Sequence, residues 1–168
     1  AIQAGWWSPA NTCTIGSPRK PGTPGACVPV PAVDLPIYSR WMSESVHELV
    51  EKRGFTNIKI LVVFTEPLDY DSGTFPKGTT RRGYYASAVR ALHEQLKADG
   101  RRSLVQLQGP KSHLLPSDLV FAEQELGDVL DIHSGHTYGL KTYMDWATAY
   151  SGAIKAVKSS GKPFIVDE

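Results

Sequence analysis

The sequence has no long apolar run, no excess of one charge and only two cysteines. Its longest uninterrupted apolar stretch is Ile60 to Phe64, far short of the roughly 20 residues that a membrane-spanning helix requires. We therefore expect no membrane partner. The 18 Lys and Arg residues nearly match the 17 Asp and Glu residues, which leaves a formal net charge of +1. This balance argues against a nucleic-acid partner.

The two cysteines, Cys13 and Cys27, flank a segment rich in Pro, Gly, Ser and Thr. A loop of this composition can fold back on itself, and we favour a Cys13–Cys27 disulfide over two free thiols. A disulfide would place the protein outside the cytosol, so we expect a secreted protein. The sequence opens on Ala1 without a basic and apolar leader, so a signal peptide either has been removed or is not part of it.

A length of 168 residues with 41% hydrophobic content predicts one globular unit with a sizeable core. Its pattern alternates amphipathic helices with short apolar strands, and a long Pro- and Gly-rich loop covers 8–35. This alternation predicts an α/β fold with parallel strands, either a doubly wound open sheet or a (β/α)8 barrel. The expected helices cover about 37–54, 85–100, 117–126 and 142–161, and the expected strands 58–64, 104–107, 129–132 and 163–166, with 1–7 as a candidate first strand.

Polar residues recur where the expected strands end, which is where parallel α/β folds gather their functional groups. Glu66 follows the strand at 58–64, and Glu168 follows the strand at 163–166. His136 and Tyr138 follow a strand between them. A carboxylate at the end of an apolar strand is costly unless it is used or paired, so each glutamate either takes part in catalysis or caps a helix or pairs with an arginine.

Three of these strand ends carry a resemblance to a known family. Thr65-Glu66-Pro67 resembles the Asn-Glu-Pro that ends the fourth strand in the large clan of retaining (β/α)8-barrel glycoside hydrolases. His136-Thr137-Tyr138 is similar to the His-x-Tyr of the clan's sixth strand, and the segment 164–168 is similar to its seventh. The clan includes cellulases, mannanases, β-glucosidases and β-xylosidases. The resemblance implies a partial catalytic domain over 1–168, from about strand three to strand seven.

The resemblance also implies roles for individual residues. Glu66 would be the general acid/base and Glu168 the nucleophile of a retaining double displacement. Tyr138 would hydrogen-bond the nucleophile, and His136 would contact sugar hydroxyls or the acid/base. Thr65 stands where the clan has an Asn that binds the 2-hydroxyl, so it would bind the sugar with a shorter reach. The alternatives are a core aromatic for Tyr138 and a loop cap for His136.

Aromatic residues give further expectations. Trp6 and Trp7 follow the candidate first strand and either stack on a sugar ring or pack under the long loop. Trp41 and Trp146 lie on helical stripes, which indicates packing between helix and sheet. His133 lies nearer the body of its strand than His136, and we expect a structural role for it.

The expected activity is hydrolysis of O-glycosidic bonds in oligo- or polysaccharides, with a carbohydrate as partner and without a cofactor or a metal. A full barrel commonly needs about 250 residues, so we expect an incomplete barrel that lacks strands one, two and eight. Two alternatives stay open. One is a catalytically impaired barrel that only binds glycans, and the other is an unrelated metal-dependent α/β hydrolase that uses His133, His136, Asp167 and Glu168. The oligomeric state is also open.

Overall fold

A computed structural model of the chain describes residues 2–3, 35–64, 68, 78–113, 115–137 and 143–167. Their core is a five-stranded sheet in which every neighbouring pair is parallel and the strands follow one another in sequence order. The strands are β1 (Ile2–Gln3), β2 (Ile60–Val62), β3 (Gln106–His113), β4 (Ile132–His136) and β5 (Phe164–Val166). The predicted α/β class is therefore confirmed.

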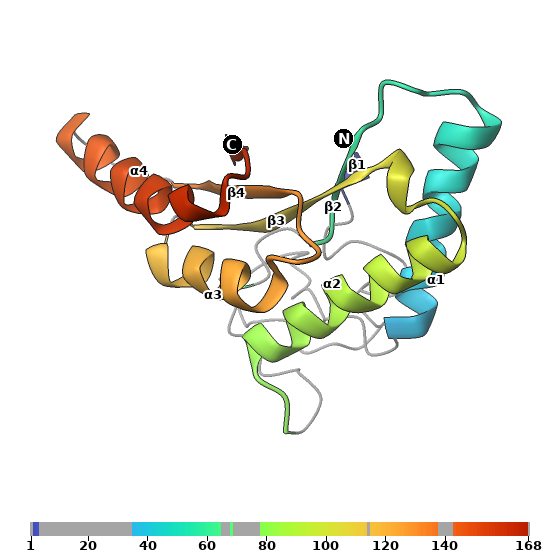
Figure 1. Cartoon of the computed structure of the whole chain (residues 1–168), viewed down its shortest axis with the longest axis horizontal. Coiled ribbons are helices and arrows are strands. Elements are labelled where there is room, and N and C mark those ends of the chain that lie inside the picture. Colours follow the sequence, from blue (N-terminus) through green and yellow to red (C-terminus); the bar gives the residue numbers. More distant parts are fainter. Residues whose placement is uncertain are drawn as a thin grey trace, which may run out of the picture.

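Within the described residues, four α-helices connect or flank these strands. They are α1 (Leu35–Val46), which continues as the π-helix η2 (His47–Lys52), α2 (Arg81–Ala98), α3 (Pro116–Leu126) and α4 (Tyr143–Val157). Two short 3-10 segments, η3 (Arg102–Leu104) and η4 (Lys158–Ser160), precede β3 and β5. Figure 1 shows α2 and α3 on the same side of β3 and β4. None of the described helices is both long and apolar enough to cross a membrane.

The two faces of the sheet differ in chemistry. The side chains of one face, which we call the helix face, pack against the helices. Leu61 and Leu107 of this face belong to a core cluster that also contains residues of α1, α2 and α3. Phe164, on the same face, packs against Ala153 and Val157 of α4. Because side chains alternate along a strand, the residues between these point to the opposite face, which we call the far face. Its members include Val62, Gln108, Ile132, Ser134, His136, Ile165 and Asp167.

The second helix illustrates how the sequence specifies an element. Thr80 caps α2, because its side-chain oxygen accepts a hydrogen bond from the Gly83 amide at 3.0 Å. Tyr85, Val89, Leu92 and Leu96 form the buried stripe, and the positive φ of Gly100 (70°) turns the chain just beyond the helix. The predicted helix at 85–100 matches α2 except for its first turn, and the same stop signal operates at Gly54 after η2.

Two strand predictions were wrong in their bounds. β3 was expected at 104–107, but it continues through Gly109 and Pro110 as far as His113. The register against β4 shifts between Gly109 and Ser112, so an irregularity lets the strand pass these residues instead of ending at them. β4 was expected at 129–132 but begins at Ile132, since Val129 lies in the turn after α3. His136 is consequently part of a strand.

Two further predictions about local structure need correction. The helix expected at 117–126 begins one residue earlier, because Leu115 occupies the cap position and Pro116 opens α3. Trp41 and Trp146 were expected to pack between helix and sheet, yet they are 39% and 38% exposed. Both lie on the helices at the two ends of the layer, α1 and α4, where no further described helix covers their outer sides.

The amino-terminal edge of the sheet is held by one ion pair. Arg102 donates from Nη2 to Asp131 Oδ2 at 2.7 Å, and the same oxygen accepts from the Leu107 amide at 2.7 Å. Arg102 also donates to the carbonyls of Val105 and Val129, each at 2.9 Å. These bonds join the chain before β3 to the chain before β4, so this edge has a structural role.

Gly109 allows β3 to lie close to α2, because a Cβ at this position would stand 2.0 Å from Tyr85 Oη. We expect Gly109→Ala to lower the free energy of unfolding by about 1–3 kcal/mol through overpacking. Adding Tyr85→Phe should recover part of this loss, since the next contact is the ring carbon Cζ at 3.3 Å. Urea unfolding of the two single variants and the double variant measures the coupling.

Gly152→Ala is the matched control for this pair, because a Cβ there meets Pro116 Cγ at an ordinary 3.4 Å. It should raise stability by up to about 1 kcal/mol, as expected for Gly to Ala inside a helix. Equal losses for Gly109→Ala with and without Tyr85→Phe would contradict the close approach of β3 and α2.

Candidate functional site

The carboxyl ends of the parallel strands bring polar side chains together on the far face. Gln108 lies in β3, Ser134 and His136 lie in β4, and Asp167 directly follows β5. All four are buried or nearly so: Gln108, Ser134 and His136 have little or no exposed surface, and the Asp167 side chain is 9% exposed. We call these four residues the far-face cluster.

Asp167 contacts two other members of this cluster, Gln108 and His136. Its Oδ2 accepts a hydrogen bond from Gln108 Nε2 at 2.9 Å, and its Oδ1 lies 3.3 Å from His136 Nδ1. The carboxylate of β5 therefore binds one side chain from β3 and one from β4. A buried carboxylate needs such partners, because an unpaired charge in a low-dielectric environment is strongly unfavourable.

The imidazole ring of His113 lies beside that of His136. His113 ends β3 and pairs in register with His136 at the end of β4. Their rings meet edge to face, with centroids 5.3 Å apart. The register shift between Gly109 and Ser112 produces this pairing, since it changes which residues of β3 stand opposite β4.

Ser134 precedes His136 by two residues in β4, so both side chains lie on the far face. Its hydroxyl is fully buried and has no hydrogen-bond partner among the described residues. A buried hydroxyl without a partner costs about 1–3 kcal/mol, so it indicates a place where a ligand hydroxyl or a water would be bound. The far-face cluster thus offers an amide, a hydroxyl, an imidazole and a carboxylate within one short stretch of three adjacent strands.

The side chain of His133 lies on the helix face, opposite to that of His136. The two histidines are three positions apart, so alternation along the strand places the His133 ring on the helix face, where Nε2 lies 2.8 Å from Glu123 Oε2 of α3. Lys162 Nζ binds the same carboxylate oxygen at 3.1 Å. This placement agrees with the structural role expected for His133.

The placement of His133 bears on the alternative of a metal-dependent hydrolase, which would use His133 and His136 together. His133 and His136 lie on opposite faces of β4, so their rings cannot bind the same ion. Within the part of the chain that the structure describes, no group of three or more His, Cys, Asp or Glu residues could hold a metal. The two histidines of the proposed set of His133, His136, Asp167 and Glu168 therefore do not share one site, and Glu168 lies outside the described residues.

Most of the predicted site residues lie outside the described residues. Of those predicted to act on the substrate, His136 alone is described, and it joins the far-face cluster. The residues outside are the catalytic pair Glu66 and Glu168, the sugar contacts Thr65, Tyr138, Trp6 and Trp7, and the cysteines Cys13 and Cys27.

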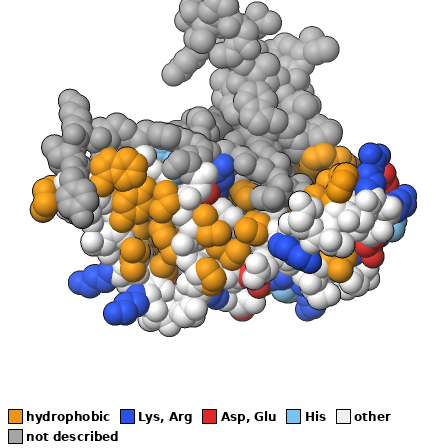
Figure 2. Space-filling view, turned by 90° about the horizontal axis from the view of Figure 1, so that it is seen from above, with side chains coloured by type: hydrophobic (Ala, Val, Ile, Leu, Met, Phe, Trp, Pro, Cys, Tyr) orange, Lys and Arg blue, Asp and Glu red, His pale blue; other side chains and the backbone are white. Residues whose placement is uncertain are grey.

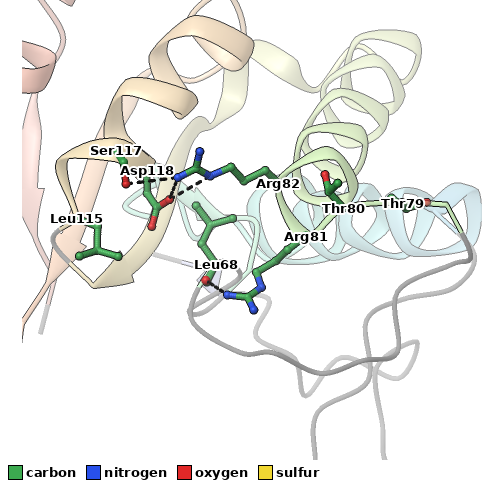
Figure 3. A pocket seen from close by; sticks show the side chains of 8 residues that line it. All are labelled: Leu68, Thr79, Thr80, Arg81, Arg82, Leu115, Ser117 and Asp118. Atoms are coloured by element: carbon green, nitrogen blue, oxygen red, sulfur yellow. Dashed lines mark hydrogen bonds and ion pairs between the residues drawn. The ribbon is translucent and has the colours of Figure 1, made fainter.

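A pocket of about 650 Å³ opens between the first turns of α2 and α3. Both helices begin on the side of the molecule where their preceding strands end, so the pocket lies at the carboxyl-terminal edge of the sheet. Figure 3 shows Arg82 reaching across to Asp118 and Ser117, and Arg81 reaching to the Leu68 carbonyl. The Arg82 to Asp118 bond is 2.6 Å long. Both arginines are bound within the protein, and the Asp118 carboxylate neutralises the charge of Arg82.

Sequence reasoning missed Gln108 and the use of Asp167. Gln108 was taken as the first residue after a strand that in fact continues to His113. The alternation of Gln106, Leu107 and Gln108 is the signal that could have found it, because a strand with polar residues on one side and leucine on the other has a polar face. Asp167 required the register of β5 against β4.

Comparison with known proteins assigns no family to this arrangement. No family model matches the chain, and no curated protein matches it significantly. The fold and the far-face cluster therefore carry the functional argument.

The Glu123–His133 pair makes stability depend on pH. Burial lowers the pKa of His133 more than the Glu123 carboxylate raises it. Burial raises the pKa of Glu123, but hydrogen bonds from Lys162 and His133 outweigh burial and leave that pKa below its usual value. As pH falls below about 6.5, the unfolded chain takes up a proton that native His133 resists, so the free energy of unfolding falls. Glu123 stabilises the fold above its unfolded pKa and loses this effect at lower pH.

We expect His133→Gln to flatten the loss of stability between pH 7 and pH 5 and to leave the loss below about pH 4.5, where carboxylates titrate. Urea unfolding at a series of pH values measures both slopes. An unchanged slope between pH 7 and pH 5 would show that His133 does not cause it.

Proposed function

We propose that this chain is part of a (β/α)8 barrel that hydrolyses O-glycosidic bonds by a retaining mechanism, with Glu66 as general acid/base and Glu168 as nucleophile. The observation that carries the proposal is the far-face cluster: a buried polar constellation at the carboxyl ends of three adjacent parallel strands. Asp167 stands immediately before Glu168, so the network ends one residue from the proposed nucleophile.

The strand order supports the barrel. A doubly wound sheet reverses its order of strand addition, whereas these five strands follow one another in one direction. Because the crossover connections between parallel strands are right-handed, they place the helices of such a sheet on a single face. The other face becomes the interior when the sheet closes into a barrel. Polar side chains near the carboxyl ends of that interior are what a barrel enzyme requires.

The exposed apolar residues at both ends of the helix layer also support the barrel. On α1, Ile37 is 59% exposed in addition to Trp41, and on α4, Met144 and Ile154 are 68% and 50% exposed in addition to Trp146. Figure 2 shows hydrophobic side chains gathered at the end of the molecule where Figure 1 places α4. Further β/α units beside β5 and β1 would bury these surfaces and pair the open strand edges.

The mechanism follows from two carboxyl groups on opposite sides of the scissile bond. Glu168 attacks the anomeric carbon while Glu66 protonates the departing glycosidic oxygen, which leaves a covalent glycosyl-enzyme. Glu66 then removes a proton from water, and the resulting oxygen attacks the same carbon and frees Glu168. The far-face cluster lies beside this reaction, where His136 and Ser134 would bind sugar hydroxyls.

Glu168→Ala tests the nucleophile. The variant should lose hydrolysis of every ordinary aryl glycoside, and azide should restore turnover with inverted stereochemistry, because a small anion fits the space left by the carboxylate. Proton NMR of the glycosyl azide product gives the configuration. Glu94→Gln is the control, since Glu94 is 66% exposed on α2 and should keep wild-type activity.

Glu66→Ala tests the acid/base. A substrate whose leaving group is already a good anion does not need the proton in the first step, so its glycosylation should survive while the intermediate accumulates. Poor leaving groups should lose about 10²- to 10⁴-fold in rate. Pre-steady-state bursts with a series of substituted phenyl glycosides measure this contrast. Equal losses on all leaving groups would contradict the assignment.

The same assays separate the alternative of a glycan-binding barrel. A chain that binds oligosaccharides but turns over none of the aryl glycosides, in a preparation that includes the complete barrel, would favour binding over catalysis.

A further inference from the structure

We infer that the pocket between the first turns of α2 and α3 binds a neutral polyhydroxy ligand, namely one sugar residue of an oligosaccharide. Its volume of about 650 Å³ lies within the range of about 300–1,000 Å³ that small-molecule sites have. The lining of the pocket is a property of the described residues alone. Its use as a subsite that holds the glycan substrate away from the cleaved bond rests on the proposed function.

Asp118 supplies a carboxylate oxygen to this pocket. Its side chain is 7% exposed, and its Oδ1 accepts hydrogen bonds from Nη2 of Arg82 at 2.6 Å and from Nε at 3.2 Å. Its Oδ2 has no hydrogen bond or ion pair within the described part of the chain. Figure 3 shows this second oxygen turned away from Arg82, toward the side of the pocket where Leu115 and Leu68 lie. A carboxylate held through one oxygen leaves the other to accept a hydrogen bond from a ligand hydroxyl.

Two hydroxyl groups of the pocket are left as donors. Thr80 Oγ1 accepts a hydrogen bond from the Gly83 amide at 3.0 Å, and Ser117 Oγ accepts one from Arg82 at 3.3 Å. Neither hydroxyl donates its own hydrogen to a described residue, so both can donate to a ligand. The pocket therefore offers an acceptor and two donors, which complement sugar hydroxyls because these both donate and accept.

The charges around the pocket favour a neutral ligand over an anion. Arg82 is paired with Asp118, so an anion beside Arg82 would also be repelled by the carboxylate. Arg81 donates from Nη1 to the Leu68 carbonyl. Leu115 is 52% exposed and lines the same pocket, where it gives the C–H groups of a sugar ring an apolar surface to pack against.

Nitrogen-15 NMR of the 168-residue chain tests the inference directly. Cellotetraose, xylotetraose and mannotetraose are titrated separately while the backbone amide signals are followed. At least one of the three should shift the amides of Thr80, Gly83, Ser117 and Asp118 to saturation. If none of them shifts these amides, or if the sugars shift only the far-face cluster, the inference is overturned.

Two substitutions identify the contacts. Ser117→Ala keeps the ion pair of Asp118 and should weaken binding by about 2- to 10-fold, the effect of one lost neutral hydrogen bond. Asp118→Asn should weaken binding by about 10-fold or more, because hydrogen bonds to a charged group are stronger. The controls are Ser45→Ala, an exposed hydroxyl on α1, and Asp128→Asn, an exposed carboxylate in another ion pair, and both should keep the wild-type affinity. Unchanged affinity in both pocket variants would contradict the assignment.

Inorganic phosphate is the competing probe, and the hydrolysis assays separate this inference from the proposed function. If phosphate shifts the pocket amides and the sugars do not, the pocket is an anion site and the inference is overturned. Saturable sugar binding at the pocket of a protein that hydrolyses no glycoside would support the inference and contradict only the proposed function. Hydrolysis of glycosides without sugar binding at the pocket would contradict only the inference.

Discussion

The five parallel strands follow one another in sequence order across the sheet, and the positions of the core and of the far-face cluster depend on this order. The connections place the described helices against one face, so the core of leucine, valine and aromatic side chains gathers there. The far face is then left for other chemistry. Because parallel strands end at the same edge, residues far apart in sequence meet: Gln108 and Asp167 are 59 positions apart and form a hydrogen bond of 2.9 Å. The opposite edge, held by Arg102 and Asp131, serves stability.

The far-face cluster has the energetic features of a functional site. Four polar side chains are buried where apolar ones would pack at lower cost, and the hydroxyl of Ser134 has no partner within the described part of the chain. On the helix face the one buried imidazole of β4, His133, is instead paired with Glu123 and serves packing. The two histidines of one strand therefore have different roles, and the face of the strand decides which role each has.

The sequence predicted the parts of this structure that depend on local periodicity. Tyr85, Val89, Leu92 and Leu96 recur at helical spacing and end at Gly100, and this helix formed as expected. The bounds of β3 and β4 were wrong, because β3 continues through Gly109 and Pro110 to His113 and β4 begins only at Ile132. The pairing of Gln108 with Asp167 was not predictable either, since it depends on the register of three strands. Trp41 and Trp146 were misjudged because a helical stripe shows which residues are apolar, but not whether a neighbour covers them.

The central claim is that Glu66 and Glu168 face each other across a glycosidic bond. The most direct measurement is the separation of their carboxyl groups in a crystal structure of the protein. Retaining hydrolysis predicts about 5 to 5.5 Å, with both side chains on the far face beside Gln108 and His136. A separation of about 6.5 to 9.5 Å would indicate inversion instead. Carboxyl groups on opposite faces of the sheet would contradict the account.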